Sequence, residues 1–180
     1  MRCGKIIYEA IPEVGFLLII YRTFLISNNE DVEELPADMF GWVSFQYIKL
    51  ENVLNLRTVH PEAMIVSMGT LKELRIKSSL MEDFPWWILP DYTSLEYLYI
   101  HYCALTRLPA LVSPSLYWLN VEGNSISALE AGWNTPTLKV LDMGEINSKM
   151  FCSVGKGCEL LMIIMRKSEK LGCSSLLSRL

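Results

Sequence analysis

Residues 95–109 decide the fold, and they read Leu-Glu-Tyr-Leu-Tyr-Ile-His-Tyr-Cys-Ala-Leu-Thr-Arg-Leu-Pro. Their apolar positions form the pattern Leu-x-x-Leu-x-Ile, followed by Leu-x-x-Leu-Pro. Leu98 and Ile100 are two residues apart, which places both side chains on one face of a β-strand. The first half of the pattern returns at four other places: Phe45-x-x-Ile48-x-Leu50, Leu71-x-x-Leu74-x-Ile76, Leu116-x-x-Leu119-x-Val121 and Leu138-x-x-Leu141-x-Met143.

The five copies begin 26, 24, 21 and 22 residues apart along the chain. One short strand cannot bury its apolar side alone, whereas successive copies stacked as parallel strands close a continuous core. We therefore expect an α/β solenoid with repeats over residues 32–150. Residues 1–31 are expected to form an N-terminal segment, a degenerate repeat or cap, and residues 151–180 a C-terminal cap or divergent tail.

A polar position follows each predicted strand at a constant offset. Asn124 lies three residues after the last apolar residue of its copy, and Cys103 and Ser79 hold the same place in the two copies before it. A buried side chain there can hydrogen-bond the backbone of the adjoining loop. We expect a row of such residues, with Cys103 bonding more weakly than Asn124 and Ser79 matching less well.

The segments that connect one copy to the next, called joints here, carry a second recurring pattern. Residues 35–40 read Leu-Pro-Ala-Asp-Met-Phe, and Phe84-Pro85 is followed by Leu89, Tyr92 and Leu95 in a similar rhythm. Over residues 32–150 the chain resembles the typical class of leucine-rich repeats found in animal extracellular proteins, including insect receptors and secreted immune proteins. That resemblance implies a horseshoe with a concave parallel β-sheet. The outer segments contain Pro61, Pro90, Pro114 and Pro136, so we expect an irregular or short-helical convex side.

The resemblance also implies a function, although one solenoid serves many tasks. It favours non-catalytic recognition of another protein, in an extracellular or secreted setting such as innate immunity. The alternative is a cytoplasmic adaptor or regulatory subunit that scaffolds an enzyme. The alternative is favoured by the absence of an Asn-x-Ser/Thr sequon and of a clear signal peptide, and by the odd count of 5 cysteines.

Side chains between the core positions of each strand should point out of the concave face. Strands lie about 4.8 Å apart, so these side chains would form one continuous surface. Tyr, Trp and Arg dominate binding hot spots, although exposed aromatic side chains can also serve only to stabilise a sheet. The predicted protein-binding residues are Tyr47, Arg75, Lys77, Tyr97, Tyr99, His101, Trp118, Asn120, Glu122 and Asp142. In the outer segments we expect Trp86, Trp87 and Trp133 to serve mainly in packing.

Other function classes find little support. The 16 basic and 20 acidic residues give a net charge of −4 without a basic run, so nucleic acid is not an expected partner. The cysteines lack Cys-x-x-Cys spacing, and no phosphate loop or nucleophile elbow is present, so we expect no metal, cofactor, small-molecule substrate or catalysis.

The two ends of the chain carry separate expectations. The apolar run at residues 15–21 is too short for a transmembrane span, which needs about 20 residues. A buried strand fits it better. The apolar run at residues 160–165 could form a helix that caps the open end of the core.

Overall fold

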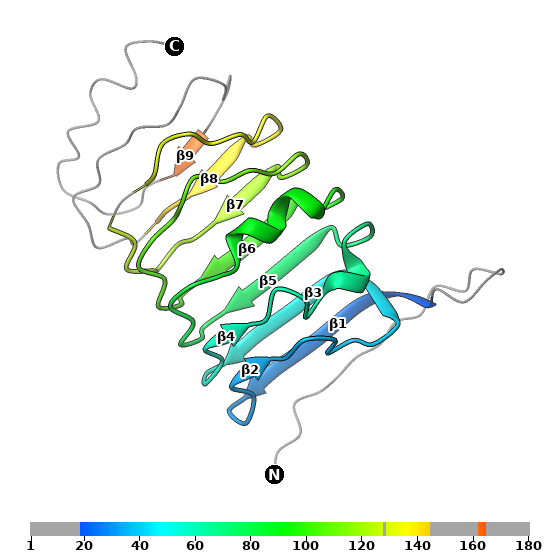
Figure 1. Ribbon diagram of the computed structural model, residues 1–180. Coiled ribbons are helices and arrows are strands. Elements are labelled where there is room, and N and C mark those ends of the chain that lie inside the picture. The colour runs from blue at the N-terminus through cyan, green and yellow to red at the C-terminus, as the bar shows by residue number, and fades with distance from the viewer. Residues whose placement is uncertain (1–18, 128, 145–161, 165–180) are drawn as a thin grey trace, which may run out of the picture.

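The chain forms a parallel β-solenoid of about five turns. The computed structural model describes residues 19–127, 129–144 and 162–164 (Figure 1). Its main element is a seven-stranded sheet in the order β1-β3-β5-β6-β7-β8-β9, in which every pair of neighbours is parallel. The strands are β1 (Ile19–Asn29), β3 (Val43–Val53), β5 (Glu73–Lys77), β6 (Tyr97–His101), β7 (Trp118–Asn120), β8 (Val140–Asp142) and β9 (Met162–Ile164).

The strand register confirms the repeat expected from the sequence. Leu98 pairs with Leu74 on one side and with Leu119 on the other, and Leu119 pairs with Leu141. Each of these leucines is at most 1% exposed. Residues one repeat apart therefore occupy equivalent places on successive strands, and their side chains form a continuous core.

The opposite side of the solenoid contains little regular structure. It holds a two-stranded parallel sheet of β2 (Glu34–Leu35) and β4 (Thr58–Val59) and two short 3-10 helices, η1 (Ile65–Ser67) and η2 (Trp86–Asp91). Pro90 lies inside η2, where a tight turn tolerates it. The expectation of an irregular or short-helical outer side is therefore confirmed for the described residues.

A row of polar side chains supports the turn that follows each strand. The Asn124 amide donates to the carbonyl oxygens of Ile100 (2.7 Å) and Val121 (2.8 Å), and its oxygen accepts from the Leu105 amide (3.1 Å). Cys103 and Ser79 continue the row, with the Ser79 hydroxyl donating to the Cys103 sulfur (3.2 Å). The predicted ladder thus links successive turns through buried hydrogen bonds.

A second row consists of residues with left-handed backbone conformation. Asn28, Asn52, Ser78, Tyr102 and Gly123 each lie two residues after a core position and have φ between 53° and 67°. Asparagine and glycine tolerate this conformation, whereas a bulky residue such as Tyr102 adopts it at an energetic cost. Asn28 and Asn52 lie near the ends of β1 and β3, and Ser78, Tyr102 and Gly123 lie just after β5, β6 and β7.

The two edge strands of the sheet bear on the expectations for the apolar runs at residues 15–21 and 160–165, and only the first of these agrees with the structure. Residues 19–21 belong to strand β1, as expected for part of the apolar run at residues 15–21, and the rest of that run lies outside the described residues. The helix suggested for residues 160–165 is wrong for residues 162–164, which form strand β9 and pair with β8. The physical reason is that the free edge of β8 offers backbone hydrogen bonds to an apolar segment.

Candidate protein-binding surface

The sheet face that turns away from the core, called the open face here, carries side chains in three rows. The register sets these rows because each strand places its alternate residues opposite those of its neighbour. Row one contains Tyr47, Glu73, Tyr97, Trp118 and Val140. Row two contains Lys49, Arg75, Tyr99, Asn120 and Asp142, and row three contains Glu51, Lys77 and His101. The structure thus brings nine of the ten predicted binding residues onto one face, and the tenth, Glu122, lies two residues after the end of β7.

Aromatic rings meet in a continuous series along β6 and its flanks. The ring of Tyr117 contacts Tyr97 at 6.2 Å between centroids, Tyr97 contacts Tyr99 at 6.5 Å, Tyr99 contacts His101 at 6.3 Å, and His101 contacts Tyr102 at 5.5 Å. We call these five residues the aromatic track. Tyr117 and Tyr102 were not predicted as binding residues, because they lie just outside the alternating positions of the strand.

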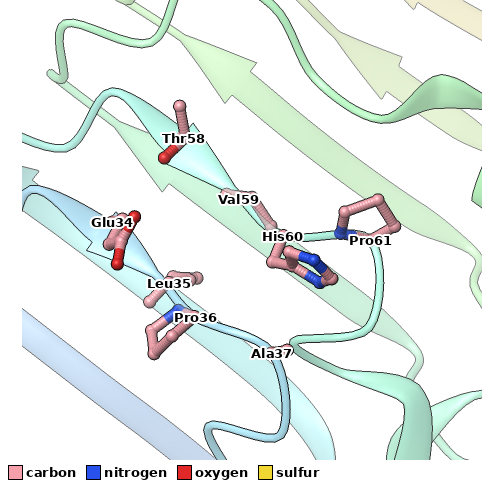
Figure 2. A pocket seen from close by; sticks show the side chains of 8 residues that line it. All are labelled: Glu34, Leu35, Pro36, Ala37, Thr58, Val59, His60 and Pro61. Atoms are coloured by element: carbon pink, nitrogen blue, oxygen red, sulfur yellow. The ribbon is translucent and has the colours of Figure 1, made fainter.

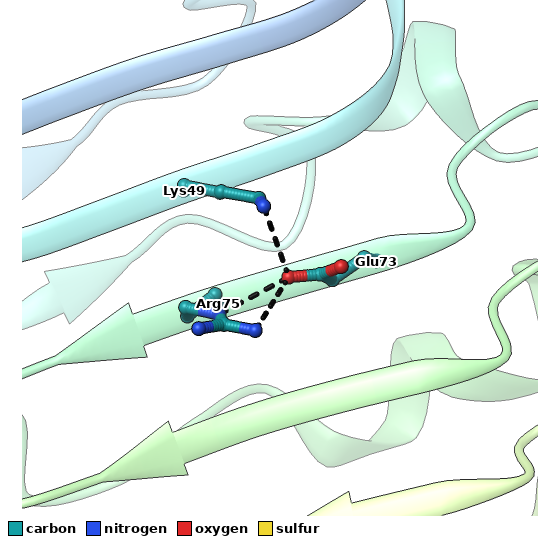
Figure 3. A network of polar contacts seen from close by, with 3 residues as sticks. All are labelled: Lys49, Glu73 and Arg75. Atoms are coloured by element: carbon teal, nitrogen blue, oxygen red, sulfur yellow. Dashed lines mark hydrogen bonds and ion pairs between the residues drawn. The ribbon is translucent and has the colours of Figure 1, made fainter.

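A charged network of Lys49, Glu73 and Arg75 joins β3 to β5 (Figure 3), and through Arg75 it touches the aromatic track. Glu73 Oε1 lies 3.0 Å from Arg75 Nη2 and 3.5 Å from Lys49 Nζ, and Arg75 Nε donates to the same oxygen at 3.1 Å. The Glu73 side chain is only 13% exposed. The Arg75 guanidinium also lies over the Tyr99 ring, 4.5 Å from its centroid. Glu73 and Tyr99 therefore fix Arg75 in one position through a carboxylate and a cation–π contact.

Burial changes the ionisation of two residues in the aromatic track. Loss of solvent, and then the nearby Glu73 carboxylate, raise the pKa of Tyr99. Loss of solvent, followed by repulsion from Lys77 and Arg75, lowers the pKa of His101 to about 4, against a smaller opposing effect of Asp142. His101 is therefore neutral at neutral pH. Its Nε2 atom is buried and has no hydrogen-bond partner within the described part of the chain.

Asn120 and Asp142 are placed differently from what the sequence suggested. They share row two with Tyr99, but they are only 8% and 4% exposed. Asn120 Oδ1 accepts from the Glu122 amide (2.9 Å), and Asp142 Oδ1 accepts from the Gly144 amide (3.1 Å). Their polar atoms thus support the local turns and offer little surface to a ligand.

The tryptophans outside the sheet divide into two groups. Trp86 and Trp133 are buried, as expected for packing residues. Trp87 is 67% exposed, so the packing expectation is wrong for this residue, because its neighbours Trp86 and Ile88 take the buried positions of η2. Trp42, 87% exposed, precedes β3 outside the repeat pattern, and no signal in the pattern singled it out.

A hollow of about 340 Å³ lies between the joints of the first two turns (Figure 2). It lies beside the β2–β4 sheet, and its lining is mostly apolar, with Glu34 and His60 as ionisable members. Both of these side chains are exposed. The lining residues are Glu34, Leu35, Pro36, Ala37, Thr58, Val59, His60 and Pro61. The lining also carries the hydroxyl of Thr58, and His60 Nδ1 accepts a hydrogen bond from the Glu62 amide at 3.2 Å.

Within residues 19–127, 129–144 and 162–164, no three His, Cys, Asp or Glu side chains lie close enough to hold a metal ion. The Cys103 sulfur packs against the core, and burial raises its pKa, so the thiol stays protonated. None of the helices in these ranges has the length and apolar character needed to cross a membrane.

No family model matches the chain. The chain is similar to the Oplophorus-luciferin 2-monooxygenase non-catalytic subunit of Oplophorus gracilirostris, with 28% identity over 120 residues. The match covers 64% of this chain and 33% of that protein, so the chain spans about a third of its relative's length.

Proposed function

We propose that this chain is a leucine-rich-repeat solenoid that binds another protein through its open face and catalyses no reaction. The in-phase pairing of Leu74, Leu98, Leu119 and Leu141 supports the repeat assignment. The ladder that contains Asn124 supports it further, because this repeat class uses Asn or Cys at that position.

The observation that carries the binding proposal is the cluster of partly exposed aromatic rings beside a fixed arginine. Tyr97, Tyr99 and Trp118 lie next to one another on β6 and β7, with Arg75 on the flanking strand. Truncation of such residues in an interface often costs about 2 kcal/mol or more. If these rings served only to stabilise the sheet, each cross-strand pair would contribute about 0.2–1 kcal/mol. That role alone does not explain why several rings on one face stay partly exposed.

The second part of the proposal concerns where the protein acts, outside the cell or in the cytoplasm. The Leu-Pro joints of residues 32–150 favour an extracellular or secreted recognition protein, as in receptors or innate immunity. The candidate alternative is a cytoplasmic adaptor or regulatory subunit that scaffolds an enzyme. The similarity to a protein named as a non-catalytic subunit supports a role beside a partner polypeptide in either setting.

The experiment that tests the binding proposal compares three purified proteins. The partner is first captured from the source tissue by the unaltered chain, identified and purified. Its affinity is then measured for the unaltered chain, for the triple variant Tyr97→Ala/Tyr99→Ala/Trp118→Ala, and for Trp87→Ala. We expect the triple variant to lose binding and Trp87→Ala, which removes an exposed ring from the opposite side, to retain it.

Circular dichroism and a melting curve must show that the triple variant remains folded. Unchanged affinity in a folded triple variant would refute the assignment of the binding surface. Fractionation of the source tissue tests the setting. Recovery only from the cytosol, with all 5 cysteines reactive to thiol reagents once the protein is denatured, would exclude the extracellular version.

A further inference from the structure

The open face has strand β6 at its centre and opposite charges on its two sides. The sheet order β1-β3-β5-β6-β7-β8-β9 places three strands on each side of β6. Row two holds Lys49 and Arg75 on the side of β3 and β5, and it holds Asp142 on β8. In row three, Lys77 lies on β5, and Glu122 continues the row after β7 by alternation.

Neighbouring charges do not cancel this difference. The three cations on the side of β3 and β5 outnumber the two carboxylates there, Glu51 and Glu73. On the other side, neither Glu122 nor Asp142 forms an ion pair with a lysine or arginine of the described ranges. Lys139 precedes β8 and therefore lies at the opposite end of that strand from Asp142. The open face is thus positive on one side of β6 and negative on the other.

A second copy of the chain complements this face when a twofold axis runs along β6. Such an axis places each strand over the strand at the same distance on the other side of β6, and it keeps every residue in its own row. Lys77 of one copy then lies over Glu122 of the other, and Lys49 lies over Asp142. Each contact occurs twice, because both copies present the same surface.

An axis that runs across the strands is excluded by the same charges. It would turn row one over row three and would place row two over itself, strand by strand. Lys49 would then face Lys49, Arg75 would face Arg75 and Asp142 would face Asp142. Like charges placed opposite one another in an interface are destabilising. Charge complementarity therefore selects the axis along β6.

The residues on this axis are compatible with their own copies. Tyr97 and Tyr99 face themselves there, and a tyrosine hydroxyl can both donate and accept a hydrogen bond. His101 also faces itself. Burial, followed by repulsion from Lys77 and Arg75, lowers the pKa of His101 to about 4, so it places no charge opposite its copy at neutral pH. Aromatic residues at the centre with charged residues around them are typical of protein interfaces.

We propose that the chain forms a reversible homodimer in which the open faces of two copies meet about a twofold axis along β6. The inference goes beyond the proposed function, because a second copy and the partner protein compete for one face. A face of about five strands, each about five residues long, measures roughly 24 by 16 Å. That is at the small end of specific interfaces, so the dimer dissociates readily and releases the face to the partner.

Sedimentation equilibrium over about a hundredfold range of protein concentration measures the association, and it needs no partner protein. The variants Lys77→Glu and Glu122→Lys each place like charges opposite one another. Each should dimerise at least about tenfold more weakly than the unaltered chain. An equimolar mixture of the two variants brings opposite charges together again at both contacts, so its association should approach that of the unaltered chain.

The matched control is Trp87→Lys, which adds a positive charge on the opposite side of the solenoid and should leave the association unchanged. Circular dichroism checks the fold of each variant. If either charge variant fails to fold, Tyr97→Lys takes its place. Because Tyr97 lies on the axis, lysine at this position meets its own copy and should also weaken the dimer at least about tenfold.

A chain that stays monomeric over the whole concentration range would overturn the inference. Charge variants that dimerise like the unaltered chain, or a mixture that associates no better than its components, would do the same. Equal weakening by Trp87→Lys would place the contact on the other side of the solenoid and would also overturn it. None of these results bears on the proposed function, which depends on the partner's affinity for the triple variant. Conversely, a dimer with the expected charge dependence would stand even if the partner bound the triple variant unchanged.

Discussion

The clearest energetic consequence of the fold concerns Asn124, whose side chain joins two turns of the solenoid. Its amide nitrogen donates to Ile100 and Val121 at 2.7 and 2.8 Å, and its oxygen accepts from the Leu105 amide at 3.1 Å. The side chain is 4% exposed, so water cannot replace these bonds. The substitution Asn124→Ala therefore leaves these two carbonyls and this amide buried without their partner, and it also removes a longer 3.3 Å bond to the Glu122 carbonyl.

The expected cost follows from these three bonds. A buried hydrogen bond contributes about 0.5–1.5 kcal/mol net, so their loss should lower the free energy of unfolding by about 3 kcal/mol. For a chain of this size, that corresponds to a fall in Tm of about 6–12 °C. Asn124→Asp preserves the shape but converts the donor into an acceptor facing two carbonyl oxygens, so it should cost at least as much at neutral pH.

Urea denaturation followed by circular dichroism measures the free energy of unfolding for each variant. Ser79→Ala is the matched control, because its hydroxyl donates to the Cys103 sulfur and accepts a long bond of 3.4 Å from the Met81 amide. It should lose less than half as much stability as Asn124→Ala. If Asn124→Ala loses less than about 1 kcal/mol, or if Asn124→Asp is neutral, the ladder does not hold the turns together as argued.

Three further changes test other parts of the structure. Leu98→Ala should lower stability by about 2–5 kcal/mol because Leu98 is fully buried, and an unaltered melting curve would mean that the core is assigned wrongly. Gly123→Ala should cost about 1–2 kcal/mol, because Gly123 has φ of +67° and an added Cβ would lie 2.5 Å from the Tyr102 ring. That cost should fall when Tyr102→Ala is added, and strict additivity in urea titrations would show that the ring is not involved. His101 has a pKa of about 4 when folded and about 6.5 when unfolded, so below pH 6.5 the unfolded chain binds the proton more readily. Stability should therefore fall as the pH drops from about 6.5 to 4, and it should fall less in His101→Gln; identical pH profiles of the two proteins would contradict the burial of this side chain.

Much of the fold could be predicted from the sequence because the same pattern of apolar positions recurs in each copy of the repeat. The positions of Leu74, Leu98, Leu119 and Leu141 recur at nearly constant spacing, and each copy independently indicates a strand with one buried face. The polar ladder through Asn124 was predictable for the same reason, since a polar residue at a fixed offset from buried positions needs a local partner.

The surface was less predictable, because alternation along a strand gives only the direction of a side chain. Asn120 and Asp142 point to the open face in register with Tyr99, yet local backbone amides engage them and they are buried. Tyr117 and Tyr102 lie outside the alternating positions, yet ring contacts with the neighbouring residues Tyr97 and His101 bring them into the track.

The sequence by itself determined the period of the solenoid, the residues of its core and the face on which its aromatic residues gather. These features follow from local spacing, because a side chain's place on a strand depends on its position in the repeat. Tertiary structure alone decided which polar side chains stay accessible, that Trp87 is exposed while Trp86 is buried, and that residues 162–164 add a strand to β8. Those outcomes depend on contacts between residues far apart in the chain, and local spacing carries no information about such contacts.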